Sequence, residues 1–291
     1  MKVIQMSQTE SIALLTDSGT NVPQRLMKKH GIYCAYLRVN YRDAQYREIL
    51  DISSAEVQDR FDEELPHTST PSPQDVEDIV QQAIADGHDH LLCVLTSSGL
   101  TSTYMVFESI LATHPEVTVE LVDTKSIGAG AGINVLYAAE LIQDGVSWSE
   151  LVERVRNAVA HSHVYFLVDS LENLYRGGRI SKAVYSLGSM LNLKPVITCS
   201  ESGTYVVAEK ARGRMKALKK EIDLVRRDIG NSVRYRIGFA TSASDDRAKI
   251  LEKVKAAFPS AERLDDYGDV SPALAVHTGK GLVGITVQVL G

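Results

Sequence analysis

Short apolar runs alternate with amphipathic stretches through the first half of the chain. The runs at 11–16, 91–95 and 117–122 have the length and composition of buried strands. Between the first two, a single apolar stripe covers 76–84 at helical spacing. Strands that alternate with helices predict an α/β region with a mainly parallel sheet covered on both faces.

Several helix ends carry recognisable capping residues. The segments 53–56 and 147–150 each have a serine followed three residues later by a glutamate, which predicts a capping box. The first of these helices is expected to extend through Leu65. Asn21 is expected to cap a further helix that ends before Gly31.

The second half of the chain has a different pattern, of α+β type, which predicts a mixed sheet. The elements expected there are strands at 163–169, 235–241 and 282–290, a short helix before 195, a hairpin at 195–210, and helices at 215–229 and 245–258. The turn residues of 201–204 indicate the hairpin. We therefore expect two tightly packed domains, 1–160 and 161–291.

Polar residues follow each predicted parallel strand. Ser, Thr, Asp and Gly come at or directly after Thr16, Thr96 and Val122. Parallel strands place their carboxyl ends at one edge of the sheet, so these loops are expected to line one crevice. The stretch 96–104 is rich in hydroxyls and contains no Lys or Arg, which suits a small anion such as a carboxylate. Alternatively, the same residues are only helix caps and turn formers.

Composition narrows the class of protein. The chain has 291 residues, is 44% hydrophobic and 23% charged, and carries a net charge of −6, which argues against a nucleic-acid partner. Its three cysteines form no C-x-x-C pair, so disulfide scaffolds and zinc sites are not expected. No apolar run approaches the roughly 20 residues of a membrane span. Residues 1–10 lack the apolar core of a signal peptide, so a cytoplasmic location is expected.

Most common site motifs are absent. The glycines at 128, 130 and 132 lack the G-x-G-x-x-G spacing because Ile133 stands at the last position, and 279–281 lacks the P-loop frame. There is no G-x-S-x-G elbow and no metal-ligand spacing. A serine-type esterase that uses Ser97 and His277 is an alternative, although no residue is evident as the orienting group. A third interpretation is a structural domain without a ligand.

The residues next to His277 and Arg179 are compatible with a role in binding an anion. His277 lies between an apolar segment and a glycine turn, and Arg179 follows two glycines. Flexible backbone beside a guanidinium is one way in which proteins bind phosphate or carboxylate. A hydrogen-bonded or exposed histidine without a binding role and a helix-capping arginine explain the two residues equally well.

Taken together, these segments resemble the DegV family of bacterial fatty-acid-binding proteins over almost the whole chain. No single motif is decisive, but their order and spacing are specific to the family. The matching segments are Leu15 to Pro23, Thr68 to Pro73, Ser97 to Tyr104, Asp123 to Gly128, Leu171 to Ile180, Lys194-Pro195 and His277 to Gly281.

The resemblance implies a two-domain DegV-like carrier without enzyme activity of its own. Such a carrier encloses one long-chain fatty acid, such as palmitate, stearate or oleate, and needs no cofactor or metal. The first domain holds the carboxylate and the second holds the tail. The carrier presents the carboxylate to a fatty-acid kinase subunit, which makes the acyl phosphate for phospholipid metabolism, and contacts membranes at most transiently.

The family pattern also assigns residues by position. It implies that the carboxylate binds to Thr68, Ser69, Ser97, Ser98 and His277, and that the kinase and the incoming phosphate face Arg179, Arg212 and Arg214. The sequence departs from the family's frequent residues at Asn21, Thr70, Ser102 and Lys280. Ser102 and Lys280 lie next to the expected head-group site.

Overall fold

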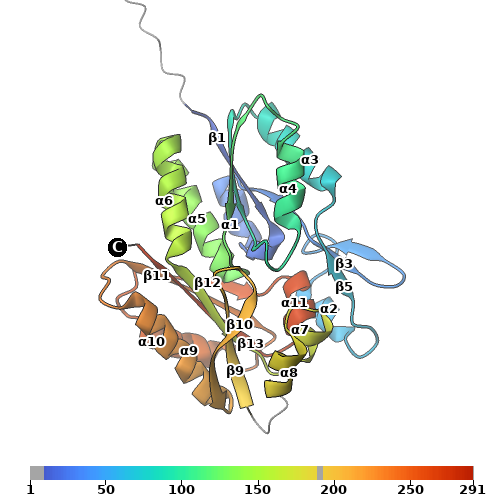
Figure 1. Ribbon diagram of the computed structural model, residues 1–291, viewed down its shortest axis with the longest axis vertical. Helices are drawn as coiled ribbons and strands as arrows, with labels where there is room; N and C mark the ends of the chain where they lie inside the picture. Colours follow the sequence, from blue (N-terminus) through green and yellow to red (C-terminus); the bar gives the residue numbers. More distant parts are fainter. Residues whose placement is uncertain (1–9, 189–192, 291) are drawn as a thin grey trace, which may run out of the picture.

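The computed structural model describes residues 10–188 and 193–290. Residues 1–9, for which the sequence predicts no signal peptide, lie outside the described residues. The described residues form three sheets with helices around them (Figure 1). Within the described ranges, no helix combines the length and the apolar character that crossing a membrane requires.

The first sheet is fully parallel, which confirms the prediction for the N-terminal half. Its order is β2 (Tyr33–Ala35), β1 (Ile12–Asp17), β6 (His90–Leu95) and β7 (Thr118–Asp123). In Figure 1, α3 (Pro73–Ala85) and α4 (Thr103–Leu111) lie on one side of this sheet, and α5 (Ala129–Gln143) and α6 (Trp148–Ala160) lie on the other. Alternate residues of β1 and β6 therefore enter two different cores.

The second sheet is mixed, as predicted for the C-terminal half. Its order is β10 (Tyr205–Arg212), β9 (Leu193–Cys199), β8 (Ser162–Leu167), β13 (Leu282–Val289), β11 (Tyr235–Ser242) and β12 (Arg263–Asp269). β11 and β12 are parallel and the other pairs are antiparallel. The helices α9 (Arg214–Ile229) and α10 (Arg247–Ala257) cover its outer face (Figure 1). β12 escaped prediction because its sequence, RLDDYGD, is too polar to indicate a strand.

Helix α5 lies between the two sheets. It contacts β1 and β6 of the first sheet and β8, β11 and β13 of the second. A Cβ atom at Gly130 would be 2.6 Å from Val164, and one at Gly132 would be 2.8 Å from Tyr267, so these glycines permit the close approach. One apolar core extends across both halves of the chain, which fits the expected tight packing. The boundary near residue 160 stays a prediction.

A third, small sheet lies beside the first. Its order is β4 (Gln45–Arg47), β3 (Arg38–Asn40) and β5 (His67–Ser69), and it is antiparallel. Helix α11 (Pro272–Thr278), from near the end of the chain, packs against α2 (Ser54–Asp59) and α7 (Glu172–Arg176), and contacts β3 and β5 (Figure 1). The remaining elements are η1 (Ser18–Thr20), α1 (Gln24–His30) and α8 (Lys182–Gly188). This sheet and α11 bring opposite ends of the sequence together.

The capping predictions were partly correct. Ser53 and Glu56 form the expected capping box, but α2 ends at Asp59 rather than at Leu65. Ser147 precedes α6 without a side-chain capping bond. The prediction for Asn21 was wrong, because its backbone is left-handed (φ 55°) after η1, and its side-chain oxygen accepts a hydrogen bond from the Ser271 amide instead.

Candidate functional site

A cleft of about 530 Å³ lies where the carboxyl end of the first sheet meets the small sheet and α11. Its walls come from the loop after β6, from β5, from α11, from the segment after α7 and from the start of β10. The lining residues are Leu37, Thr68, Ser69, Thr70, Thr96, Ser98, Gly99, Leu100, Thr101, Ser102, Ile127, Arg179, Tyr205, Ala273, Leu274, His277 and Thr278. The structure thus brings together Thr68, Ser69, Ser98, Arg179 and His277.

Thr68 and His277 form the centre of one wall. The Thr68 Oγ1 atom is 2.7 Å from the Nε2 atom of His277, so β5 and α11 are joined by a direct hydrogen bond. Burial, with smaller contributions from the nearby Arg179 and His67, lowers the pKa of His277 to about 3. The imidazole is therefore neutral at physiological pH and can either donate to or accept from Thr68.

Gly177 makes room for the imidazole. A Cβ atom at this position would be 2.2 Å from the Nδ1 atom of His277. The backbone of Gly177 is right-handed (φ −74°), so the contact with His277, rather than the backbone conformation, requires glycine here. The next residue, Gly178, has a φ of +72° and no atom within 4 Å of its would-be Cβ. The two adjacent glycines thus serve different purposes.

Arg179 lies between the cleft and a second cavity of about 610 Å³. Thr68 and His277 also line both spaces, so the three residues form the partition. One guanidinium N–H of Arg179 donates to the Gly177 carbonyl at 2.7 Å. Burial lowers the pKa of Arg179, but an arginine remains charged. The partition therefore carries a half-buried cation.

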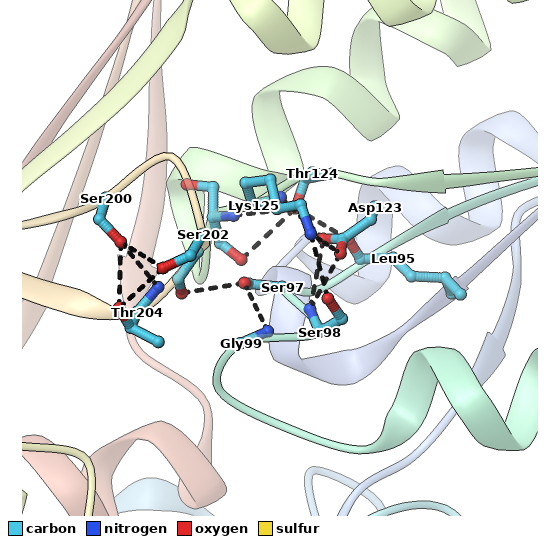
Figure 2. A network of polar contacts seen from close by, with 12 residues as sticks. Leu95, Ser97, Ser98, Gly99, Asp123, Thr124, Lys125, Ser200, Ser202 and Thr204 are labelled. Carbon is cyan, nitrogen blue, oxygen red and sulfur yellow. Dashed lines mark hydrogen bonds and ion pairs between the residues drawn. The ribbon is translucent and has the colours of Figure 1, made fainter.

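The hydroxyl-rich loop between β6 and α4, residues 96–102, is held by contacts with the β9–β10 turn and with the loop after β7 (Figure 2). The buried Ser97 hydroxyl donates to the Gly203 carbonyl at 2.9 Å and accepts from the Gly99 amide at 3.1 Å. The Ser98 amide donates to the Asp123 carboxylate, and its hydroxyl accepts from Lys125 at 3.2 Å. Ser98 lines the cleft, whereas Ser97 lies beneath the loop and ties it to the hairpin.

These contacts do not support the esterase alternative. A serine nucleophile needs its hydroxyl within hydrogen-bond distance of the side chain that acts as the general base. Ser97 instead donates to Gly203, and the Nε2 atom of His277 bonds to Thr68. The two side chains therefore do not form the required pair.

The other two predicted arginines lie elsewhere. Arg214 bonds to the Asp169 carboxylate at 3.0 Å and to the Gly281 carbonyl at 2.6 Å. Arg212 ends β10, opposite Leu193. Neither arginine is among the described residues that line the cleft.

An apolar slot of about 40 Å³ adjoins the cleft. Four residues line both spaces: Ile127, Tyr205, Leu274 and Thr278. The other walls of the slot come mainly from the second sheet, including Val164, Phe166, Ala240, Leu282 and Gly284. Phe166 and Tyr205 meet edge to face with ring centroids 5.2 Å apart. The cleft is therefore polar on one side and continues into an apolar interior on the other.

The sequence did not single out Tyr205, Leu274 or Thr278 as site residues. The positions 274, 277 and 278 share one helical face, a spacing that would have revealed them once 272–278 was recognised as a helix. Tyr205 carried no comparable signal. Within the described ranges, no group of three or more His, Cys, Asp or Glu residues could hold a metal ion.

Comparisons with known proteins agree on one family. The family model described as "Uncharacterised protein, DegV family" matches residues 11–289. A DegV domain-containing protein of Clostridium acetobutylicum is 32% identical over 280 residues, which cover 96% of this chain and 99% of the relative. A solved structure described as fatty acid binding of a DegV family protein from Thermus thermophilus is 32% identical, has a TM-score of 0.89 and covers 96% of this chain and 100% of its own. DegV from Bacillus subtilis, described as a fatty acid binding protein, is 26% identical with a TM-score of 0.86, and the match covers 96% of this chain and 99% of its own.

Proposed function

Because this chain belongs to the DegV family, we propose that it binds one long-chain fatty acid. The carboxylate occupies the cleft beside Thr68 and His277, and the tail enters the apolar slot. The observation that carries this proposal is the continuity of the two spaces through Ile127, Tyr205, Leu274 and Thr278. Two solved relatives, 32% and 26% identical and both described as fatty acid binding, support it.

The polar side of the cleft suits a carboxylate. A buried carboxylate is costly unless several donors converge on it. Ser69 and Ser98 supply hydroxyl groups, and Arg179 supplies a positive charge from the partition. Thr68 can donate to the ligand when the Nε2–H of His277 donates to Thr68. The head group thus receives its orientation from three separate segments of the chain.

The tail supplies most of the affinity. Burial of a methylene contributes about 0.8 kcal/mol, so about 14 methylenes contribute on the order of 11 kcal/mol before ordering costs. The slot of about 40 Å³ is little larger than one water molecule's share of about 30 Å³. A long tail therefore requires the walls around Phe166 and Tyr205 to separate.

We further propose that the protein is a cytoplasmic carrier that presents the bound carboxylate to a fatty-acid kinase. In this role the chain holds the acid and the partner transfers phosphate from ATP. Arg179 supports the proposal because it lines both the cleft and the second cavity. A phosphate that approached through the second cavity would meet its guanidinium.

Organic extraction of the purified and denatured protein tests the binding proposal. Mass spectrometry should detect about one fatty acid per chain. Thr68→Ala should weaken retention by removing a head-group donor, and Ser97→Ala should weaken it by loosening the loop from Gly203. Arg179→Ala should leave the lipid bound, because the tail supplies most of the affinity, but should reduce acyl-phosphate formation by a kinase partner. Protein without lipid that also fails to bind added fatty acid, or that hydrolyses an ester unaided, would contradict the proposal.

A further inference from the structure

Glu48 is a fully buried carboxyl group that joins three distant segments of the chain. It follows β4 of the small sheet. One oxygen accepts a hydrogen bond from the Ser18 hydroxyl, 30 residues away in the sequence. The other accepts from the Ala273 amide at 2.7 Å, 225 residues away. Ser18 lies in η1 after β1, and Ala273 lies in the first turn of α11.

These contacts lead directly to the proposed head-group site. Ala273 and His277 are one helical turn apart on α11, and both line the cleft. On the other side, β4 pairs with β3, and β3 pairs with β5, where Val39 lies opposite Thr68. Glu48 therefore bridges the small sheet to α11 behind the wall in which Thr68 and His277 meet.

Ser18 extends the same arrangement. Its hydroxyl accepts a hydrogen bond from the Leu37 amide at 2.8 Å, just before β3 begins. Ser18 thus connects the turn after β1 both to Glu48 and to the start of the small sheet. The hydrogen bonds of Glu48 and Ser18 therefore fix α11 and the small sheet relative to the first sheet as well as relative to each other.

The choice of a carboxyl group at this position is costly. The net pKa of Glu48 is raised to about 7, because the effect of burial outweighs the lowering effect of the Ser18 and Ala273 hydrogen bonds; the nearby Asp17 adds a smaller raising effect. Packing alone would be served as well by an apolar side chain. A glutamate has the reach and the two acceptor oxygens needed to hold Ser18 and Ala273 together.

We propose that Glu48 is a positioning residue that fixes α11 against the small sheet, so that Thr68 and His277 face the same carboxylate head group. This inference rests on the proposed fatty-acid binding. Glu48 is not among the described residues that line the cleft, so it acts through α11 and the small sheet rather than by touching the ligand.

Fatty-acid affinity of delipidated variants, measured by displacement of a fluorescent fatty acid, tests the proposal. Glu48→Ala should lower affinity about tenfold, which corresponds to the loss of a buried hydrogen bond to a charged group. Glu48→Gln should stay within about threefold of wild type because the amide oxygen still accepts from Ala273. Glu221→Ala is the matched control, since Glu221 is equally buried but lies on α9, away from the cleft. It should alter the unfolding midpoint and leave affinity unchanged.

A double-mutant cycle separates positioning from general stability. In a Thr68→Ala background, Glu48→Ala should cost less than about threefold, because the side chain that it positions is already gone. An equal loss in both backgrounds, a Glu48→Ala affinity equal to wild type, or a Glu48→Gln affinity as low as that of Glu48→Ala would overturn the inference.

Two further outcomes are also decisive. If Glu48→Ala does not fold, Ser18→Ala replaces it in the cycle; an affinity loss of about threefold that disappears in the Thr68→Ala background supports the inference, and unchanged affinity overturns it. A wild-type protein that binds no fatty acid would overturn the proposed function itself. Wild-type binding with an unaffected Glu48→Ala variant would overturn only the role of Glu48.

Discussion

The region behind the wall of the cleft and the core beneath α9 each contain a fully buried glutamate, and the two glutamates have opposite surroundings. Beside the cleft, Glu48 accepts hydrogen bonds from Ser18 and Ala273. Beneath α9, neither carboxyl oxygen of Glu221 has a hydrogen-bond partner in the part of the chain that the structure describes. Burial raises the pKa of both groups. The same residue type is thus satisfied in one region and unsatisfied in the other.

The difference separates orientation from stability. We refer to the buried residues between α9, α10 and the second sheet as the α9 core; it includes Leu218, Val225, Phe239, Ile250 and Ile285. This core is mainly apolar, and burial of its side chains favours folding without fixing a ligand. Around the cleft, paired polar groups hold α11, the small sheet and the turn after β1 in defined positions. We expect substitutions in the α9 core to change stability and substitutions around the cleft to change binding.

The largest effect should come from Phe239→Ala in the α9 core. Phe239 is fully buried, so its truncation should lower the free energy of unfolding by about 3–5 kcal/mol. Urea denaturation measures this loss. The fatty acid content per folded chain should stay unchanged, and a fall in that content would show that the two regions are not separable.

Gly177→Ala should have the next largest effect, and it should act on binding. The new Cβ would overlap the Nδ1 atom of His277, so the imidazole must move away from Thr68. Overpacking of this kind costs about 1–3 kcal/mol. We expect fatty-acid affinity to fall about tenfold, the equivalent of one lost hydrogen bond.

Gly178→Ala is the matched control for that experiment. Its φ of +72° makes alanine strained, at about 1–2 kcal/mol, but its Cβ would meet nothing within 4 Å. It should lower stability and leave affinity close to wild type. An equal loss of affinity in both variants would indicate that the loop, rather than the position of His277, controls binding.

In both regions the sequence predicted the features that depend on neighbouring residues, but not the contacts between distant segments. Period and turn chemistry identified the strands around Leu14 and Leu92 and the turn at Gly203, because these depend on neighbours along the chain. The bridge from Glu48 to Ala273 spans 225 residues and leaves no local pattern. The family resemblance brought Thr68 and His277 to attention, but not the bond between them.

Ser97 illustrates a further limit. Its place in a hydroxyl-rich loop suggested contact with the ligand. In the structure its hydroxyl bonds to Gly203 of the facing hairpin, where a Cβ atom would be 1.9 Å away. Which hydroxyl in the loop faces the cleft depends on this long-range contact, and the local sequence cannot determine it.

Glu221→Leu should give a smaller effect of opposite sign, an increase in stability. The leucine removes an unsatisfied carboxyl group from the α9 core, which should stabilise the fold by about 1–3 kcal/mol at neutral pH. Burial raises the folded-state pKa well above 4.5, so above that pH the unfolded state loses its proton first and wild-type stability falls. The advantage of the variant should therefore grow by up to about 1.4 kcal/mol per pH unit as pH rises.

Urea denaturation at about pH 5 and about pH 8 measures that advantage. Glu48 contributes its own dependence on pH, but it is present in both proteins and cancels in the difference. A difference that stays constant with pH would mean that Glu221 is ionised in the folded protein.

The last prediction is that the imidazole of His277 does not titrate between about pH 5 and about pH 8. Burial lowers its pKa to about 3, whereas the carboxylates of Glu116 and Glu77 raise the pKa of His114 above 6.5. In NMR spectra the ring protons of His277 should stay constant over this range, whereas those of His114 should titrate at a pH above 6.5. In the unfolded protein His277 takes up a proton below about pH 6.5, whereas in the folded protein its ring stays neutral. Protonation therefore favours the unfolded state, and the free energy of unfolding decreases as the pH falls below about 6.5. A ring that titrated near pH 6.5 would mean that the wall around Thr68 is open to water. The Thr68–His277 hydrogen bond would then not hold the cleft in a fixed geometry, and the proposed difference between the cleft and the α9 core would be wrong.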